Sequence, residues 1–157
     1  MTRSTADGGT SAMFTTIVVG ADGSDEGDAA VVVATTMART SGAHVVVVHV
    51  IEMLSGKGGQ YPLHADEGEI RTRIAASVEQ ARADGVDIEL EVHPIAYGGP
   101  AHVIAQTADR VDADLIVVGN RGHNPIAEIL LGAVPSRLLH IAHRPVLVVP
   151  AKAAAAV

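Results

Sequence analysis

Three glycines in the second half of the chain have the spacing of a loop that binds phosphate groups. Gly119 and Gly122 follow the apolar run 115–118, and Gly132 precedes the segment 133–136. Glycines that connect a strand to a helix let backbone N–H groups approach a ligand closely. The first N–H groups of that helix have no partner within it and lie at its positive end, so they attract phosphate oxygens. The spacing therefore predicts a site for a phosphate-bearing small molecule, with a nucleotide as the first candidate.

The two best-known phosphate motifs do not occur around these glycines. A Walker loop requires GxxxxGK[ST], but neither Lys57 nor Lys152 follows a glycine turn of that form. A Rossmann fingerprint requires GxGxxG after the first strand, and neither Gly20 nor Gly119 begins one. The glycine loop therefore belongs to another class of phosphate site.

The composition excludes several classes of protein. The chain has 157 residues, enough for one domain with a core, and 48% of them are hydrophobic. Only Phe14, Tyr61 and Tyr97 are aromatic and the net charge is −7, so we expect no nucleic-acid surface. Without cysteine, disulfides, thiolate catalysis and Cys-ligated zinc are excluded. No apolar run is long enough to cross a bilayer and no signal peptide is recognisable, so we expect a cytoplasmic protein without membrane contact.

Strand-like and helix-like segments alternate along residues 14–150, which we expect to form one domain between a disordered segment (1–13) and a flexible tail (151–157). Periodicity and turn residues predict strands at 16–20, 44–51, 86–95, 115–118 and 145–149, and helices at 25–41, 65–84, 100–110 and 135–143. The stretch 54–63 contains three glycines and a proline and is expected to be a loop. This alternation predicts an α/β fold, a doubly wound five-stranded parallel sheet with helices on both faces.

The expected strand order, 3-2-1-4-5, brings the first and fourth strands together. Ligands of such sheets bind beyond the carboxyl ends of the strands, where the strand order reverses. The polar turns 20–24 and 119–122 follow these two strands. Topology and glycine spacing thus predict the same cleft.

The sequence resembles the nucleotide-binding branch of the universal stress protein family over nearly its whole length. The likeness joins the segments 17–24, 49–50 and 144–149 with the three glycines, each weak alone and strong in this order. In nucleotide-binding members the glycine loop surrounds the ribose and phosphates, and the aspartate after the first strand and the residue after the histidine of the second strand contact the adenosine. The resemblance implies an adenine nucleotide alpha hydrolase-like fold and these matching nucleotide-binding positions: Asp22, Val50, Val118, Gly119, Gly122 and Gly132. Four residues next to them complete the predicted nucleotide-binding set: Ala21, Arg121, Ala133 and Val134.

Two positions depart from the pattern of the ATP-binding members. Those members usually carry hydroxyl residues directly after the third glycine and two positions later, where this chain has Ala133 and Pro135; Ser136 lies one residue late. Each lost hydrogen bond to the outer phosphates would weaken binding by about 1–3 kcal/mol. Proline at this place is similar to members that prefer cyclic AMP. The expected ligand is an adenine nucleotide, ATP or AMP, with cyclic AMP as the alternative and a Mg²⁺ requirement left open.

Several of these residues also have a purely structural interpretation. Asp22 can organise a turn in which Ser24 caps the first helix, and the glycines can serve turns that require positive φ. Arg121 can bridge to a phosphate or remain a solvated loop charge. His49, in a buried strand, is expected to be a core histidine with its hydrogen bonds satisfied.

Metal binding and catalysis find little support in the sequence. His123, His140 and His143 are not accompanied by Cys or by a carboxylate-spaced motif, so no metal site is expected. Paired catalytic carboxylates, an activated lysine and a Gly-x-Ser-x-Gly elbow cannot be recognised, so we expect no catalytic residues, although slow ATP hydrolysis is a rival interpretation.

The last strand would leave an open apolar edge on the sheet. An uncovered edge of Val146–Val149 is an aggregation hazard, and the resemblance implies that it pairs with its symmetry mate in a homodimer. We therefore expect a cytoplasmic dimer that binds an adenine nucleotide reversibly and acts as a stress-response sensor or regulator. A dimeric interaction protein of the same fold that binds no nucleotide is the alternative.

Overall fold

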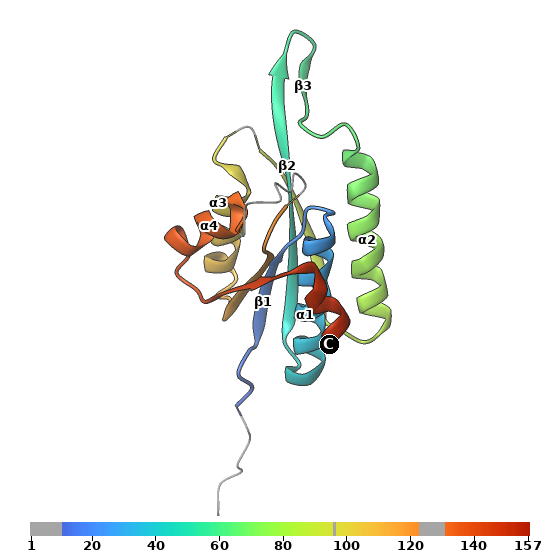
Figure 1. The fold of residues 1–157 in the computed structure, drawn as a ribbon, viewed down its shortest axis with the longest axis vertical. Helices are drawn as coiled ribbons and strands as arrows, with labels where there is room; N and C mark the ends of the chain where they lie inside the picture. Colours follow the sequence, from blue (N-terminus) through green and yellow to red (C-terminus); the bar gives the residue numbers. More distant parts are fainter. Residues whose placement is uncertain (1–10, 96, 123–130) are drawn as a thin grey trace, which may run out of the picture.

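The computed structural model describes residues 11–95, 97–122 and 131–157, and Figure 1 shows the chain as a sheet between two layers of helices. Within these residues the elements follow in the order β1 (Thr16–Gly20), α1 (Asp25–Ser41), β2 (His44–Gly56), β3 (Gly59–Pro62), α2 (Glu67–Ala83), β4 (Ile88–Ile95), α3 (Gly99–Arg110), β5 (Leu115–Gly119), α4 (Ala133–Ile141), β6 (Val146–Val149) and the 3-10 helix η1 (Ala151–Ala156). Most of the segment expected to be disordered, residues 1–10, lies outside the described part.

Five of the strands form a parallel sheet in the order β4-β2-β1-β5-β6, which confirms the predicted order 3-2-1-4-5. In the centre of the sheet, Val18 of β1 pairs with Val46 of β2 and with Ile116 of β5. All three are fully buried, because helices cover both faces of a doubly wound sheet. This is why β1, the first half of β2 and β5 are rich in β-branched residues.

The helices pack in two layers, α1 and α2 on one face of the sheet and α3 and α4 on the other (Figure 1). Helix α1 begins as predicted, with the Gly27 N–H donating to the Ser24 Oγ at 3.0 Å. Not every apolar residue of α1 faces the sheet: Val32 is 40% exposed, whereas Ala30 and Ala34 are fully buried. Three valines in succession, 31–33, leave the helical face ambiguous, and the small alanines allow the closer approach to the sheet.

The stretch 54–63 forms a β-hairpin, which corrects the expected loop. Strand β2 continues past the end of β1 and turns after Gly56 into the antiparallel β3, so that Leu54 pairs with Tyr61. Gly59 has a φ of 110°, a conformation that favours glycine. A side chain at Gly56 would lie 2.9 Å from the Tyr61 ring, so this glycine gives the ring room. The glycines that suggested a loop are therefore turn and packing residues of a hairpin, which rises above the sheet in Figure 1.

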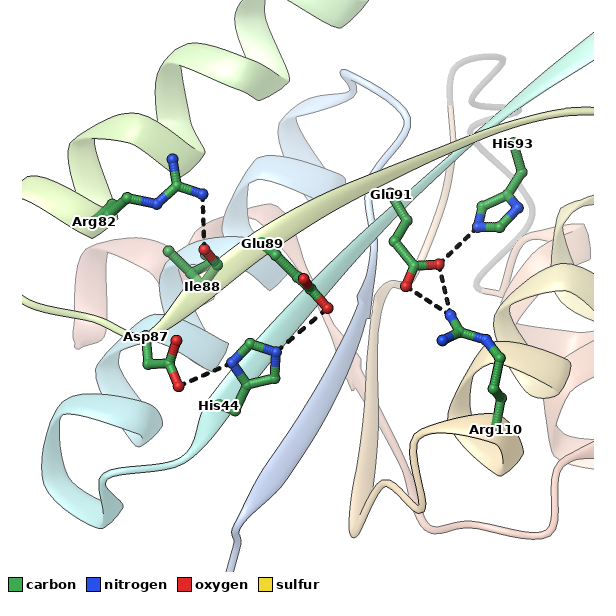
Figure 2. Close-up of polar contacts among 8 residues, drawn as sticks. All are labelled: His44, Arg82, Asp87, Ile88, Glu89, Glu91, His93 and Arg110. Carbon is green, nitrogen blue, oxygen red and sulfur yellow. Dashed lines mark hydrogen bonds and ion pairs between the residues drawn. The ribbon is translucent and has the colours of Figure 1, made fainter.

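The two outer strands of the parallel sheet differ in chemistry. Figure 2 shows the polar contacts of β4: Arg110 of α3 donates from Nη2 to both Glu91 oxygens, at 2.6 and 2.7 Å, and His93 Nε2 lies 2.8 Å from the same carboxylate. Burial raises the pKa of Glu91, but Arg110 and His93 together outweigh it and hold that pKa below its ordinary value. Charged residues and Pro94 thus protect this edge, whereas β6 is entirely apolar, with Leu147 37% exposed.

The last residues of the chain, for which the sequence predicted a flexible tail, pack against the helical layer. Residues 151–156 form η1, and Ala153 and Ala154 pack on the core cluster that includes the buried face of α1. Small residues without turn signals gave no indication of this contact. Among the described helices, none combines the length and apolarity that crossing a membrane would require.

Asp114 links the start of β1 to the start of β5. Its Oδ2 accepts hydrogen bonds from the Thr15 N–H at 2.7 Å, the Thr16 N–H at 3.0 Å and the Thr15 hydroxyl at 2.9 Å. The backbone N–H of Thr15 is the largest cause, followed by that of Thr16, of an Asp114 pKa below its ordinary value. The carboxylate therefore fixes the two strands whose far ends carry the predicted cleft.

Candidate functional site

A cavity of about 570 Å³ lies beyond the carboxyl ends of β1 and β5, where the strand order reverses, and against the part of β2 that continues past β1. Its volume is in the range of about 300–1,000 Å³ that is usual for small-molecule sites. All ten predicted site residues line it: Ala21, Asp22, Val50, Val118, Gly119, Arg121, Gly122, Gly132, Ala133 and Val134. Pro135 and Ser136, which the sequence analysis placed at the phosphate end, also line it. The cavity has further walls that the sequence analysis did not include: Glu52, His64, Glu67, Ile70, Pro100, Ile104 and Leu131.

Asp22 both organises the turn after β1 and lines the cavity. Its Oδ1 accepts from the Ser24 N–H at 3.0 Å and from the Ser24 hydroxyl at 2.5 Å. Its Oδ2 faces the glycine loop, since a Cβ built on Gly122 would lie 2.9 Å from this oxygen. Oδ1 therefore holds the turn, and Oδ2 is the oxygen that is available to a ligand.

The three loop glycines are required for close approach and not for unusual backbone angles. None of them is among the residues with positive φ, so the expected alternative of positive-φ turns was wrong. A Cβ on Gly119 would lie 2.7 Å from the backbone carbon of Glu26 in α1, and one on Gly132 would lie 3.2 Å from the Cα of Arg121. Gly119 thus lets the end of β5 touch α1. Gly132 lets the start of α4 lie close to the backbone at Arg121, just after β5.

The start of α4 offers two backbone donors to the cavity. As the first two helical residues, Ala133 and Val134 have N–H groups without an intrahelical acceptor. Pro135 has no N–H, and the Ser136 N–H donates to the Gly132 carbonyl at 3.1 Å. The positive end of α4 therefore presents two amides, and the Ser136 side chain borders the same space.

Arg121 brings a positive charge to the cavity wall. Its side chain is 34% exposed, and its Nη2 lies 3.4 Å from the Oε1 of Glu26, a long contact. Its Nε is buried and has no partner among the described residues. This position disfavours a purely solvated charge and places Arg121 in the wall of the same cavity as Ala133 and Val134.

A gap in the backbone hydrogen bonding of β2 opens into the cavity. Alternate residues of a strand direct their backbone groups to the same edge. Val48 bonds the β1 side, where its carbonyl accepts from the Ala21 N–H at 3.0 Å, and the Glu52 carbonyl accepts from the Leu63 N–H at 2.7 Å after β1 has ended. Val50 lies between them, and no described residue bonds its backbone at that edge. Its N–H and C=O therefore point into the cleft as a neighbouring donor and acceptor.

His49 is the buried, fully bonded histidine that the sequence predicted. It is 3% exposed, its Nδ1 lies 2.8 Å from the Ala21 carbonyl, and its Nε2 lies 2.6 Å from the Oε1 of Glu67. Glu67 is the first residue of α2 and is 7% exposed. Nothing in the sequence indicated this partner, because the contact depends on where the hairpin returns the chain.

The other histidines of the metal hypothesis have separate partners. His140 donates from Nδ1 to the Ser136 carbonyl at 2.8 Å, and His143, which lies beyond the end of α4, is 3.0 Å from Asp109. His123 lies outside the described residues. In the ranges that the structure covers, no three or more His, Asp or Glu side chains are grouped so as to hold a metal ion.

The fold and the cavity define a small doubly wound α/β protein with a ligand site at its topological switch point. The chain belongs to the universal stress protein family, whose sequence model matches residues 13–150. The match therefore covers the whole sheet and both sides of the cavity.

Individual relatives agree with this assignment. A universal stress protein of Thermus aquaticus, described by its position in the QAH/OAS sulfhydrylase 3′ region, is 33% identical over 137 residues, covering 87% of this chain and 99% of its own. Universal stress protein YxiE of Bacillus subtilis is 30% identical over 147 residues, with 87% and 99% covered.

Two solved structures combine similar sequence with a bound nucleotide. A universal stress protein in complex with cAMP superposes with a TM-score of 0.64 at 32% identity, covering 88% of this chain and 98% of its own. A universal stress protein from Archaeoglobus fulgidus in complex with dAMP has a TM-score of 0.62 at 28% identity, with 87% and 97% covered.

Proposed function

We propose that this protein binds an adenine nucleotide reversibly in the cavity between β1, β2 and β5, and that the backbone of Val50 reads the base. Adenine presents an acceptor, N1, beside a donor, the N6 amino group. The Val50 N–H and C=O offer the complementary pair. Guanine carries a carbonyl oxygen where adenine carries the amino group, so it would place acceptor against acceptor. The gap at Val50 is the single observation that carries the proposal.

The phosphate end of the cavity fits a nucleotide with one phosphate better than ATP. Two free amides, at Ala133 and Val134, and the guanidinium of Arg121 can surround one phosphate group. Ala133 and Pro135 bring no hydroxyl for further phosphates. The neighbours solved with cAMP and dAMP both hold single-phosphate nucleotides, which supports this choice.

The proposed role is a regulatory one in a cytoplasmic stress response, without turnover of the ligand. A ligand shifts a conformational balance only as far as it binds one state better than the other. The β2–β3 hairpin is suited to respond, because Glu52 lines the cavity and its carbonyl holds the returning chain at Leu63. Hydrogen exchange in residues 54–63 should slow when nucleotide is added; unchanged exchange would remove the hairpin from the mechanism.

We further propose that β6 pairs with its copy in a two-fold dimer. The outer edge of β4 is protected by charge and proline, whereas β6 exposes an apolar strand with Leu147 at its surface. This contrast supports association at β6 and not at the opposite edge. The dimer interface would then lie at the outer edge of β6, which separates it from β5 and the cavity.

Calorimetric titration with AMP, cyclic AMP, ATP and GMP, each with and without Mg²⁺, tests the function. We expect AMP or cyclic AMP to bind more tightly than ATP, GMP to bind at least about tenfold more weakly than AMP, and Mg²⁺ to have little effect on the single-phosphate ligands. Equal binding of GMP would contradict base reading by Val50. If no adenine nucleotide binds at millimolar concentration, a dimeric interaction protein without nucleotide becomes the better interpretation. Steady phosphate release from ATP would instead support the ATPase alternative.

A further inference from the structure

The contact between His49 and Glu67 joins three elements around the cavity. His49 belongs to β2, its Nδ1 partner Ala21 is the residue after β1, and its Nε2 partner Glu67 begins α2. The side chains of His49 and Glu67 are only 4% and 9% exposed, yet both residues line the cavity. A buried, hydrogen-bonded polar pair in the wall of a ligand site calls for a role beyond filling the core.

The hydrogen-bond geometry requires a hydrogen on each side of the His49 ring. The Ala21 carbonyl can only accept, so the Nδ1 atom of His49 must carry a hydrogen. One further proton then lies between Nε2 and the Glu67 carboxyl group, held by either partner. In both forms the imidazole ring is clamped at its two nitrogens and cannot rotate without breaking a buried hydrogen bond.

This clamp acts on the turn that carries Asp22. Ala21 is held through its N–H by Val48 and through its carbonyl by His49, at 3.0 and 2.8 Å. Asp22 follows directly, with Oδ1 bound to Ser24 and Oδ2 facing the glycine loop. The direction of the free Asp22 oxygen therefore depends on a chain of contacts that starts at α2.

We propose that His49 and Glu67 are positioning residues: they hold the Asp22 turn in the geometry that receives the nucleotide and thereby couple the start of α2 to occupancy of the cavity. The inference rests on the proposed nucleotide function, but it concerns residues that do not themselves contact the phosphates. It requires that loss of the Glu67 contact weakens binding through Asp22 and not through general loosening of the fold.

The test is a double-mutant cycle with AMP as the ligand, measured by calorimetry. Glu67→Met removes the partner of Nε2 at similar volume, Glu67→Gln keeps a hydrogen bond to the imidazole without the carboxylate, and Asp22→Asn removes the positioned charge. Thr35→Val is the matched control, because the Thr35 hydroxyl is a buried donor on α1, to the Val32 carbonyl at 3.0 Å, outside the cavity.

We expect Glu67→Met to weaken AMP binding about tenfold and Glu67→Gln to restore most of that loss. In the Asp22→Asn background the effect of Glu67→Met should shrink to about twofold or less, since the group that it positions is already gone. An equal effect in both backgrounds, or a loss in Thr35→Val as large as in Glu67→Met, overturns the proposal. If the unaltered protein binds no adenine nucleotide, the proposed function fails first, so the two failures are distinguishable. If it binds cyclic AMP and not AMP, the same cycle is measured with cyclic AMP.

Amide hydrogen exchange without ligand distinguishes a local change in the Asp22 turn from general unfolding of a variant. The Ser24 amide donates to Asp22 Oδ1, so its hydrogen-exchange rate reports on the turn itself. Glu67→Met should speed exchange at Ser24 relative to the amides of β5, and Thr35→Val should not. Equal protection of Ser24 in Glu67→Met and in the unaltered protein contradicts the positioning role.

Discussion

Replacing Gly119 by alanine should destabilise the fold, although this residue belongs to the predicted ligand loop. The added Cβ would lie 2.7 Å from both the backbone carbon and the Cβ of Glu26, and 2.9 Å from its carbonyl oxygen. These atoms belong to the first turn of α1 and cannot rotate away as a side-chain tip can. Helix α1 or the end of β5 must therefore move. Overpacking of this kind costs about 1–3 kcal/mol.

The matched comparison is Gly122→Ala in the same loop. Its Cβ would meet the Asp22 Oδ2 at 2.9 Å, and this atom is the end of a side chain. We expect the stability to change by about 0.5 kcal/mol or less, and the affinity for AMP to fall because the Asp22 carboxylate is displaced. Gly68→Ala, in an exposed part of α2 with nothing within 4 Å of the new Cβ, should instead stabilise by about 0.5–1 kcal/mol.

Thermal unfolding followed by circular dichroism, at one fixed protein concentration, checks these values. For a domain of this size about 1 kcal/mol corresponds to 2–4 °C, so Gly119→Ala should lower the Tm by about 2–12 °C. A Tm equal to that of the unaltered protein would refute the packing argument. Gly119→Val, which at first looks like a simple way to block the cleft, is for the same reason a poor test of binding alone.

Three further predictions concern acid stability, assembly and the phosphates. Asp114→Asn should lower the free energy of unfolding at neutral pH, and in urea titrations this free energy should then depend less on pH in acid. The pKa of Asp114 is lowered in the folded state, so the stabilisation from Thr15 and Thr16 is complete above the unfolded pKa near 3.8 and is lost as the pH falls through the folded pKa. Leu147→Lys should give monomers in sedimentation velocity, because the charge lies on the exposed apolar edge; persistent dimers would place the interface elsewhere. Ala133→Ser should strengthen ATP binding relative to AMP by about tenfold in calorimetry, and equal changes for both ligands would show that the hydroxyl does not reach the outer phosphates.

Local signals in the sequence were sufficient for most of the fold. The β-branched runs of β1 and β5 and the cap at Ser24 depend on near neighbours, and the structure confirms them. The hairpin after Leu54 was missed, because glycine-rich composition suits loops and hairpin turns equally. The inward face of α1 cannot be assigned from spacing alone, because apolar residues occur on more than one side of that helix.

The candidate site was predictable where its residues follow strand ends and not where it depends on contacts between distant elements. The glycine loop and Asp22 lie in the cavity, since the topology alone brings the ends of β1 and β5 together. Glu67 and His64 reach the same cavity only because the hairpin returns to it. Likewise, the contact of Gly119 with Glu26 reveals a packing role that a motif cannot distinguish from a ligand role.

The gap at Val50 also limits what can enter the sheet from outside. A peptide unit carries the same neighbouring donor and acceptor as an adenine edge, so in hydrogen-bonding terms an extended chain would match Val50 equally well. The vacancy, however, is one residue long, because the Val48 carbonyl is already bonded by Ala21 and the Glu52 carbonyl by Leu63. A foreign strand could form no ladder there, whereas a flat ring fits a single position. The length of this opening therefore favours small molecules over polypeptides, whatever their hydrogen-bonding pattern.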